Sequence, residues 1–181
     1  MLRVDKPTPM AKVNLGYKSP ALSDPDHLPL SVLGEVLFGG RSSRLVKKLI
    51  RERELATDVR VFVSPFIDPG LFEVFASGRS GVTPEVLLDV IDEEIQRVRQ
   101  SGVTQDELDR ARARIELGLL QGLATADGKA STVGFYDVVL GDPAAAFGRL
   151  AALEHVTLEQ LHDVARRYLD RSQRTVVLAR P

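Results

Sequence analysis

Apolar residues near the start of the chain alternate with polar ones, as a half-buried strand requires. Between Met10 and Lys18, the side chains of Val13, Leu15 and Tyr17 fall on one side of an extended chain. Further strands are predicted at 57–63 and 71–77, where β-branched and aromatic residues cluster. The prolines and glycine between these two runs favour a hairpin. Both runs carry apolar residues on each face, so we expect the sheet to be covered on more than one side. A last strand is predicted at 174–179.

The other apolar runs have helical spacing. Asp24-Pro25 is typical of an N-cap followed by proline at the first helical position, and the glycines at 39 and 40 end this first helix. Thr104 with Glu107 forms a capping-box signature, because each side chain can satisfy a free amide of the first turn, and Thr157 with Gln160 repeats it. Helices are predicted at 25–38, 42–54, 83–100, 105–122, 128–140, 144–153 and 157–168.

The order of these elements is strand, two helices, two strands, several helices, strand. Since strands and helices do not alternate strictly, we expect an α+β fold with a single, mostly antiparallel sheet and helices packed against it. Residues 1–9 have two prolines and no periodic apolar pattern, which predicts a linker or an extended entry segment. Residues 10–181 then form one domain, and no second copy of the pattern occurs.

Composition excludes several classes of function. The 181 residues include 24 basic and 25 acidic side chains, and a net charge of -1 would not attract nucleic acid or an anionic membrane. No apolar stretch approaches the ~20 residues that cross a bilayer, so we expect no membrane span. Cysteine is absent, which excludes disulfides, thiolate zinc ligands and a cysteine nucleophile. The compartment stays open, since bacterial cytoplasm and periplasm are both compatible with this composition.

The histidines do not have the spacing of a metal site. His27, His155 and His162 form neither His-x-x-x-His nor His-x-x-Glu-His, the patterns that place two ligands one helical turn apart. A predicted helix start separates His155 from His162. Asp24 and Asp26 lie beside His27 at another helix start, where acidic side chains are favoured by the helix dipole. We therefore expect no metal bound by this chain.

The short motifs of this chain lack the patterns of a nucleotide site or a serine nucleophile. Gly39-Gly40-Arg41-Ser42-Ser43 precedes a helix but lacks the Gly-x-x-x-x-Gly-Lys-Ser/Thr pattern of a phosphate-binding loop, and a turn between two helices explains its glycines. No Gly-x-Ser-x-Gly occurs, so Ser42 and Ser43 are interpreted as N-caps of the second helix. The alternating arginines at 110, 112 and 114 are interleaved with acidic residues, which is typical of a solvated helix face.

In order along the chain, several segments resemble the repeating domain of the insulinase/pitrilysin zinc peptidases. These segments are Asp26-His27-Leu28, Leu37-Phe38-Gly39-Gly40-Arg41-Ser42-Ser43-Arg44-Leu45, Gly102-Val103-Thr104, Glu107-Leu108-Asp109-Arg110-Ala111, Val156-Thr157, Val164-Ala165-Arg166-Arg167-Tyr168-Leu169 and Thr175-Val176-Val177. In that family the catalytic copy carries His-x-x-Glu-His near its first helix. The matching helix here has Leu28-Pro29-Leu30-Ser31-Val32, so the chain resembles the later, metal-free half.

The resemblance also suggests where a substrate would be contacted. Many relatives carry an arginine and a tyrosine after the Ser-Arg-Leu turn, but the matching positions here are Ile50 and Thr57, so both polar contacts are missing. Arg51 and Arg53 lie near these positions and are interpreted as a solvated helix edge. In some relatives a glycine-rich loop lies near the substrate path. The corresponding residues are our candidate substrate-binding segment: Gly39, Gly40, Arg41, Ser42 and Ser43.

The resemblance implies the non-catalytic half of a two-part zinc-dependent metallopeptidase. Such a half forms a closed chamber and a peptide-binding wall with a partner half, which supplies the zinc. We expect no cofactor and no peptidase activity in this chain alone. Two alternatives stay open: a structural scaffold subunit of a larger complex, and a stand-alone module that binds extended peptides along a sheet edge.

Overall fold

The strands of this chain form one five-stranded sheet. The computed structural model describes residues 2–5 and 8–180. The strand order is β1-β5-β2-β4-β3, and β1 is parallel to β5 while the other neighbours are antiparallel. The strands are β1 (Leu2–Asp5), β2 (Lys12–Ser19), β3 (Ala56–Val63), β4 (Gly70–Gly78) and β5 (Arg174–Arg180). The expected hairpin is the antiparallel pair β3 and β4.

The start of the chain, expected to be a linker or an extended entry segment, is in part a strand. Leu2–Asp5 pairs with β5, with Leu2 opposite Val177. A short edge strand is held by backbone hydrogen bonds to one neighbour, and a periodic side-chain pattern does not reveal such a pairing. Residues 1, 6 and 7 of the expected linker lie outside the described residues.

The helices follow the expected order. They are α1 (His27–Phe38), α2 (Arg44–Val46), the π-helical turn η1 (Lys47–Glu52), α3 (Pro84–Ser101), α4 (Gln105–Gly122), α5 (Ala126–Leu140), α6 (Ala145–Glu154), α7 (Leu158–Tyr168) and the short 3₁₀ turn η2 (Arg171–Gln173). The first helix starts later than predicted, with Asp26 as its N-cap, because the Asp24 carboxylate accepts the Asp26 amide at 2.8 Å in a preceding turn. Within the described part of the chain, no helix has the length and apolarity needed to cross a bilayer.

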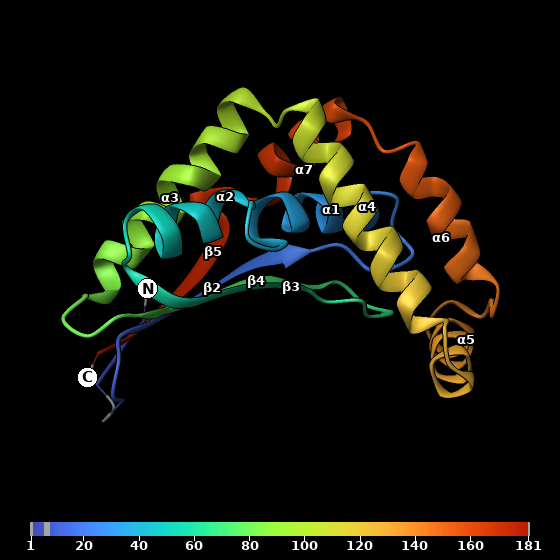
Figure 1. The fold of residues 1–181 in the computed structure, drawn as a ribbon, viewed down its shortest axis with the longest axis horizontal. Coiled ribbons are helices and arrows are strands. Elements are labelled where there is room, and N and C mark those ends of the chain that lie inside the picture. Colours follow the sequence, from blue (N-terminus) through green and yellow to red (C-terminus); the bar gives the residue numbers. More distant parts are fainter. Residues whose placement is uncertain (1, 6–7, 181) are drawn as a thin grey trace.

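The sheet is covered on one face, so the expectation of cover on more than one side is wrong for the described residues. Figure 1 shows α1, α3, α4 and α7 above the sheet and no helix beneath it. On the helix-free face, Phe62 is 46% and Phe75 is 38% exposed, and they line an open groove of about 660 Å³. β-branched and aromatic residues suit a pleated strand whether or not a second layer covers them. Apolar residues on both faces of these strands therefore did not indicate cover on both faces.

The helix-covered face of the sheet carries the core. Tyr17 of β2 and Phe72 of β4 are fully buried and meet edge to face, with ring centroids 6.3 Å apart. Arg174 of β5 donates to the Tyr17 hydroxyl at 3.1 Å and pairs with Asp92 of α3 at 2.7 Å. Burial raises the pKa of Tyr17, so the phenol stays protonated and accepts this bond. The network ties two strands to α3.

One helix stands apart from this core. No residue of α5 is buried, and Val138 is 79% exposed. In Figure 1, α5 lies beyond the end of α4, away from the layer of helices over the sheet. The isolated domain therefore leaves two apolar surfaces open, the helix-free face of the sheet and the α5 region.

Candidate functional site

The turn between α1 and α2 contains the candidate segment. Gly40 has a φ of +88°, a left-handed conformation that favours glycine. Its carbonyl accepts both the amide of Ser43 at 3.2 Å and the Ser43 hydroxyl at 2.8 Å. A side chain at Gly39 would collide with Glu35, and one at Gly40 would press on the guanidinium of Arg114. The two glycines therefore let the turn approach α1 and α4 closely.

The N-cap interpretation of the two serines holds only for the position of Ser43. Ser43 is the residue before α2, but its hydroxyl makes no capping bond and instead donates back to Gly40. Ser42 is exposed. The turn is therefore closed by hydrogen bonds to the Gly40 carbonyl. Neither serine side chain accepts a hydrogen bond from the first amides of α2.

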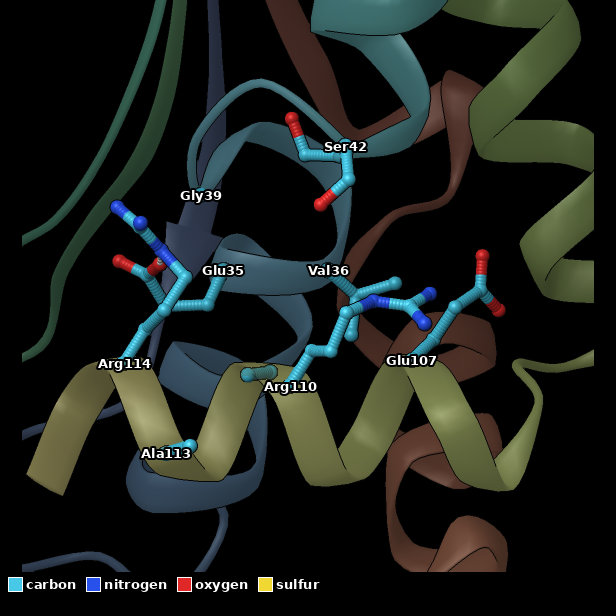
Figure 2. Close-up of a pocket in the computed structure, with 10 residues that line it drawn as sticks. Glu35, Val36, Gly39, Ser42, Glu107, Arg110, Ala113 and Arg114 are labelled. Atoms are coloured by element: carbon cyan, nitrogen blue, oxygen red, sulfur yellow. Dashed lines mark hydrogen bonds and ion pairs between the residues drawn. The ribbon is translucent and has the colours of Figure 1, made fainter.

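A pocket of about 260 Å³ lies between this turn and α4 (Figure 2). Its lining residues come from the end of α1, the turn and the first half of α4: Glu35, Val36, Gly39, Ser42, Ser43, Glu107, Arg110, Ala111, Ala113 and Arg114. Three of the five candidate residues thus line one pocket, whereas Gly40 and Arg41 do not. Whether this segment binds a substrate stays a prediction.

The two carboxylates of the pocket are held in ion pairs. Glu107 receives two hydrogen bonds from Arg44, at 2.7 Å and 2.6 Å, and one from the Thr104 amide at 2.9 Å. Burial opposes the ionisation of Glu107, but the bonds from Arg44 and Thr104 prevail and hold the pKa of this carboxyl below its ordinary value. Glu35 accepts a hydrogen bond from Arg114 at 3.1 Å. Both acids are therefore already neutralised.

Arg110 is the lining cation without such a partner. It is exposed and makes no hydrogen bond or ion pair with any other described residue. Figure 2 shows its side chain running from α4 along the pocket, between Val36 and Glu107. The pocket therefore offers a guanidinium from α4 and a hydroxyl from Ser42 of the turn as hydrogen-bond donors.

The pocket lacks the groups for nucleophilic catalysis. No histidine lines it, the Ser43 hydroxyl donates to a carbonyl, and both carboxylates are paired. A serine nucleophile needs a free base within hydrogen-bond reach. The residues of this pocket provide none.

The helix face of alternating arginines is only partly the solvated surface that its charge pattern predicts. Arg112 is half-buried and donates to the Val156 carbonyl, and Arg114 reaches Glu35 of α1. No local signal could have paired residue 114 with residue 35, since 79 positions separate them. The charge pattern therefore did not predict that α4 forms one side of the pocket.

The histidines lie in separate places, as their spacing predicts. His27 is buried and hydrogen-bonds the Ser64 carbonyl at 3.1 Å, whereas His162 bonds the Arg99 carbonyl at 2.9 Å. Across residues 2–5 and 8–180, no group of three or more histidine, aspartate or glutamate side chains is placed to hold a metal ion.

Ile50 and Thr57, the two positions that the resemblance matches to an arginine and a tyrosine, lie outside the pocket. Ile50 is half-buried against the core, and the Thr57 hydroxyl on β3 donates to the Ser77 carbonyl at 3.3 Å. Arg51 and Arg53 are exposed, and Arg53 pairs with Glu93 of α3 at 3.0 Å. Neither arginine lines the pocket.

Comparison with known proteins gives one consistent result. Residues 2–115 match the family model of the peptidase M16 inactive domain. The chain is 31% identical over 168 residues to an uncharacterized zinc protease of Streptomyces coelicolor, a match that covers 93% of this chain and 36% of that protein. The chain thus spans less than half the length of such relatives.

Solved structures agree in fold. A protease from Helicobacter pylori superimposes with a TM-score of 0.92 at 25% identity, over 99% of this chain and 43% of that one. The inactive peptidase domain from Bordetella parapertussis has a TM-score of 0.84 at 23% identity, and the match covers 98% of this chain and 96% of that one. The α+β architecture and the resemblance to the non-catalytic domain are confirmed: the chain belongs to the peptidase M16 inactive domain family.

Proposed function

We propose that this domain is the non-catalytic half of a two-part zinc-dependent metallopeptidase. A partner half, in the same polypeptide or in a separate one, would carry His-x-x-Glu-His, the zinc ion and the general base. This domain would close a chamber over that centre and contribute a peptide-binding wall. The observation that carries the proposal is an M16 inactive-domain fold with no metal-binding cluster in its described residues.

The zinc that the family implies does not fit the described residues of this chain, which contain no cluster of three or more possible ligands. Zinc in hydrolases is held by about three nitrogen or oxygen side chains. His27 lies on α1, His162 lies on α7 and His155 follows the end of α6, and two of the three hydrogen-bond backbone carbonyls. We therefore derive no step of the reaction from a metal in this domain.

The open surfaces of the domain support a role as one part of a larger body. Exposed apolar side chains gather on the helix-free face of the sheet and around α5, where Phe147 is 56% exposed. Contiguous apolar surface on a small domain usually marks an interface. Because the chain spans 36% of a zinc protease relative, the remaining part of such a protein is available to cover it.

The pocket beside the glycine turn is the proposed peptide contact. Arg110 and Ser42 can hydrogen-bond peptide carbonyl groups, and they belong to a pocket without catalytic groups of its own. In this proposal the domain orients the peptide while the partner cleaves it.

Reconstitution of the two parts tests the proposal. The chain would be mixed with the polypeptide encoded upstream or beside it that contains His-x-x-Glu-His, and cleavage of a quenched fluorescent peptide would be followed. We expect cleavage by the mixture and none by this chain alone, and no stoichiometric zinc in this chain by metal analysis. The matched control replaces the glutamate of the partner's motif by glutamine.

Two outcomes would contradict the proposal. One is tightly held zinc, at one ion per chain, in the purified domain. The other is a partner that cleaves peptide equally well with and without this domain. If the two polypeptides bind each other but the mixture cleaves nothing, the scaffold alternative is favoured.

A further inference from the structure

One partly buried arginine in this domain differs from the others in its partners. Among the described arginines, five are half-buried, and each of four is paired with a carboxylate. These four pairs are Arg44 with Glu107, Arg99 with Asp170, Arg112 with Asp109 and Arg174 with Asp92. Arg149 of α6 makes no ion pair with another described residue. A partly desolvated charge without a counter-ion costs stability, so its presence calls for another explanation.

The guanidinium of Arg149 is positioned by neutral acceptors. It donates to the Leu22 carbonyl at 3.2 Å and to Nδ1 of His27, also at 3.2 Å. Nε2 of His27 lies 3.1 Å from the Ser64 carbonyl, which accepts a hydrogen bond from it and leaves Nδ1 as an acceptor. Burial lowers the pKa of Arg149, and a hydrogen bond with the Tyr136 side chain acts in the opposite direction. The side chain is therefore held in one orientation but its charge is not balanced.

Arg149 lines a pocket between the loop before α1 and the α5–α6 region. The pocket has a volume of about 580 Å³, within the usual range for small-ligand sites. Its apolar wall comes from Leu22, Leu28, Leu140 and Val156. A charged group with a fixed orientation thus faces a pocket with an apolar wall.

Two carboxylates lie at the same pocket without neutralising Arg149. An Asp24 oxygen accepts the Asp26 amide at 2.8 Å, and an Asp142 oxygen accepts the Ala144 amide at 2.9 Å. Neither acid is within ion-pair distance of Arg149. These acids disfavour a multiply charged inorganic anion, and their remaining lone pairs favour a ligand that also brings N–H donors.

A peptide C-terminus combines the required groups. Its carboxylate matches the planar fork of a guanidinium, its amide N–H groups match the acids, and an apolar terminal side chain matches the wall. We propose that this pocket binds the C-terminal carboxylate of a peptide that ends in an apolar residue, with Arg149 as the recognition residue. The site is separate from the glycine-turn pocket and does not depend on the proposed catalytic partner.

The experiment uses the purified chain and two matched probes. N-acetyl-leucyl-leucine and its C-terminal amide would be titrated by calorimetry. We expect the acid to bind at least about tenfold more tightly, the equivalent of ~1.4 kcal/mol. In Arg149→Gln this preference should vanish, while Arg166→Gln, an exposed arginine of α7, should keep it. Arg149→Lys should retain only part of it, because a lysine cannot form a bidentate pair.

Chemical-shift mapping on the unaltered chain covers the case in which a variant does not fold. The acid should shift the amide signals of Leu140 and Gly148, which line this pocket, and not those of Ser42 in the other pocket. The proposal fails if acid and amide bind equally, if Arg149→Gln keeps the preference, or if the unaltered chain binds neither probe at millimolar concentration. Each failure leaves the partner assay of the proposed function unaffected.

Discussion

At the scale of single residues, the glycine turn depends on one left-handed backbone position. Gly40 adopts a φ of +88°, and its carbonyl holds both the amide and the hydroxyl of Ser43. An L-residue in this region costs about 1–2 kcal/mol. The sequence indicated a flexible turn here, but the pocket that the turn forms with α4 required the folded chain.

Replacing Gly40 by alanine should therefore destabilise the fold by about 1–2 kcal/mol, as measured by urea unfolding. Gly118→Ala is the matched control, because Gly118 is a helical residue of α4 with open space around it. This second change should stabilise the domain by about 0.5–1 kcal/mol. Equal effects of the two substitutions would contradict the assigned backbone strain.

His27 is the residue that should couple stability to pH. Burial lowers the pKa of His27 below its ordinary value of 6.5, and the nearby charge of Arg149 acts in the same direction. Between the folded and the unfolded pKa, the unfolded chain binds more protons. The free energy of unfolding should therefore fall as the pH decreases from neutrality through about 6.5 and below.

This pH dependence can be measured by thermal unfolding across the range of about pH 8 to pH 5. In His27→Gln the slope should be shallower, because the glutamine amide does not titrate and can still donate to Ser64. His155→Gln, the same substitution at an exposed histidine, is the matched control variant. If the stability of His27→Gln has the same pH dependence as that of the unaltered chain, the assignment of His27 as buried and neutral is wrong.

At the scale of elements, the helix starts with capping boxes were predicted correctly. The Thr104 hydroxyl accepts a hydrogen bond from the Glu107 amide, and the Glu107 carboxylate accepts one from the Thr104 amide. In the second box, the Thr157 hydroxyl accepts from the Gln160 backbone amide, and the side-chain carbonyl oxygen of Gln160 accepts from the Thr157 amide. These bonds join residues within one turn, so sequence spacing is enough to predict them. Glu107 also binds Arg44, which lies 63 positions away. No local sequence pattern predicts that tertiary contact.

The cap of α4 should be worth more to the domain than the cap of α5. Thr104→Ala is expected to cost about 1 kcal/mol of unfolding free energy, because α4 packs on the core through Leu108 and Ala111. Thr125→Ala removes the analogous bond to Gly128, but α5 buries no residue, and its loss should stay within about 0.5 kcal/mol. Chemical denaturation measures the loss of unfolding free energy in each variant. A larger loss for Thr125→Ala than for Thr104→Ala would show that α5 is integral to the fold.

The second helix shows the limit of spacing at this scale. Residues 44–52 are helical as predicted, but Lys47–Glu52 forms a π-helical turn, and Glu54 follows with a φ of +50°. Leu45 and Leu49, four residues apart, are buried. Their spacing is compatible with an α-helix or a π-helix, so the hydrophobic pattern does not distinguish them.

At the scale of the whole molecule, stability should be uneven. β2 lies between β4 and β5, and its inward side chains at 13, 15 and 17 are buried. α5 makes no comparable contact. Regions with few buried contacts open at low free energy.

Hydrogen exchange followed by mass spectrometry should therefore show the slowest amides in β2 and β4 and the fastest helical amides in α5. On addition of a catalytic partner, protection of α5 should rise, while β2 should change little because it is already buried. Exchange in the free chain that is as slow in α5 as in β2 would contradict the unpartnered state of this helix.

The sequence by itself determined the order of most elements, the helix caps, the family and the lack of spacing for a metal site. Periodicity, capping and composition are local properties of the chain, and they need no knowledge of what packs against what. Only the tertiary structure decided that the sheet has one helix-free face, that Leu2–Asp5 joins its edge and that α5 stays uncovered. The two pockets likewise join residues that lie far apart in sequence, such as Ser42 with Arg110 and Leu22 with Arg149. Such contacts depend on how the helices cross, which local spacing does not encode.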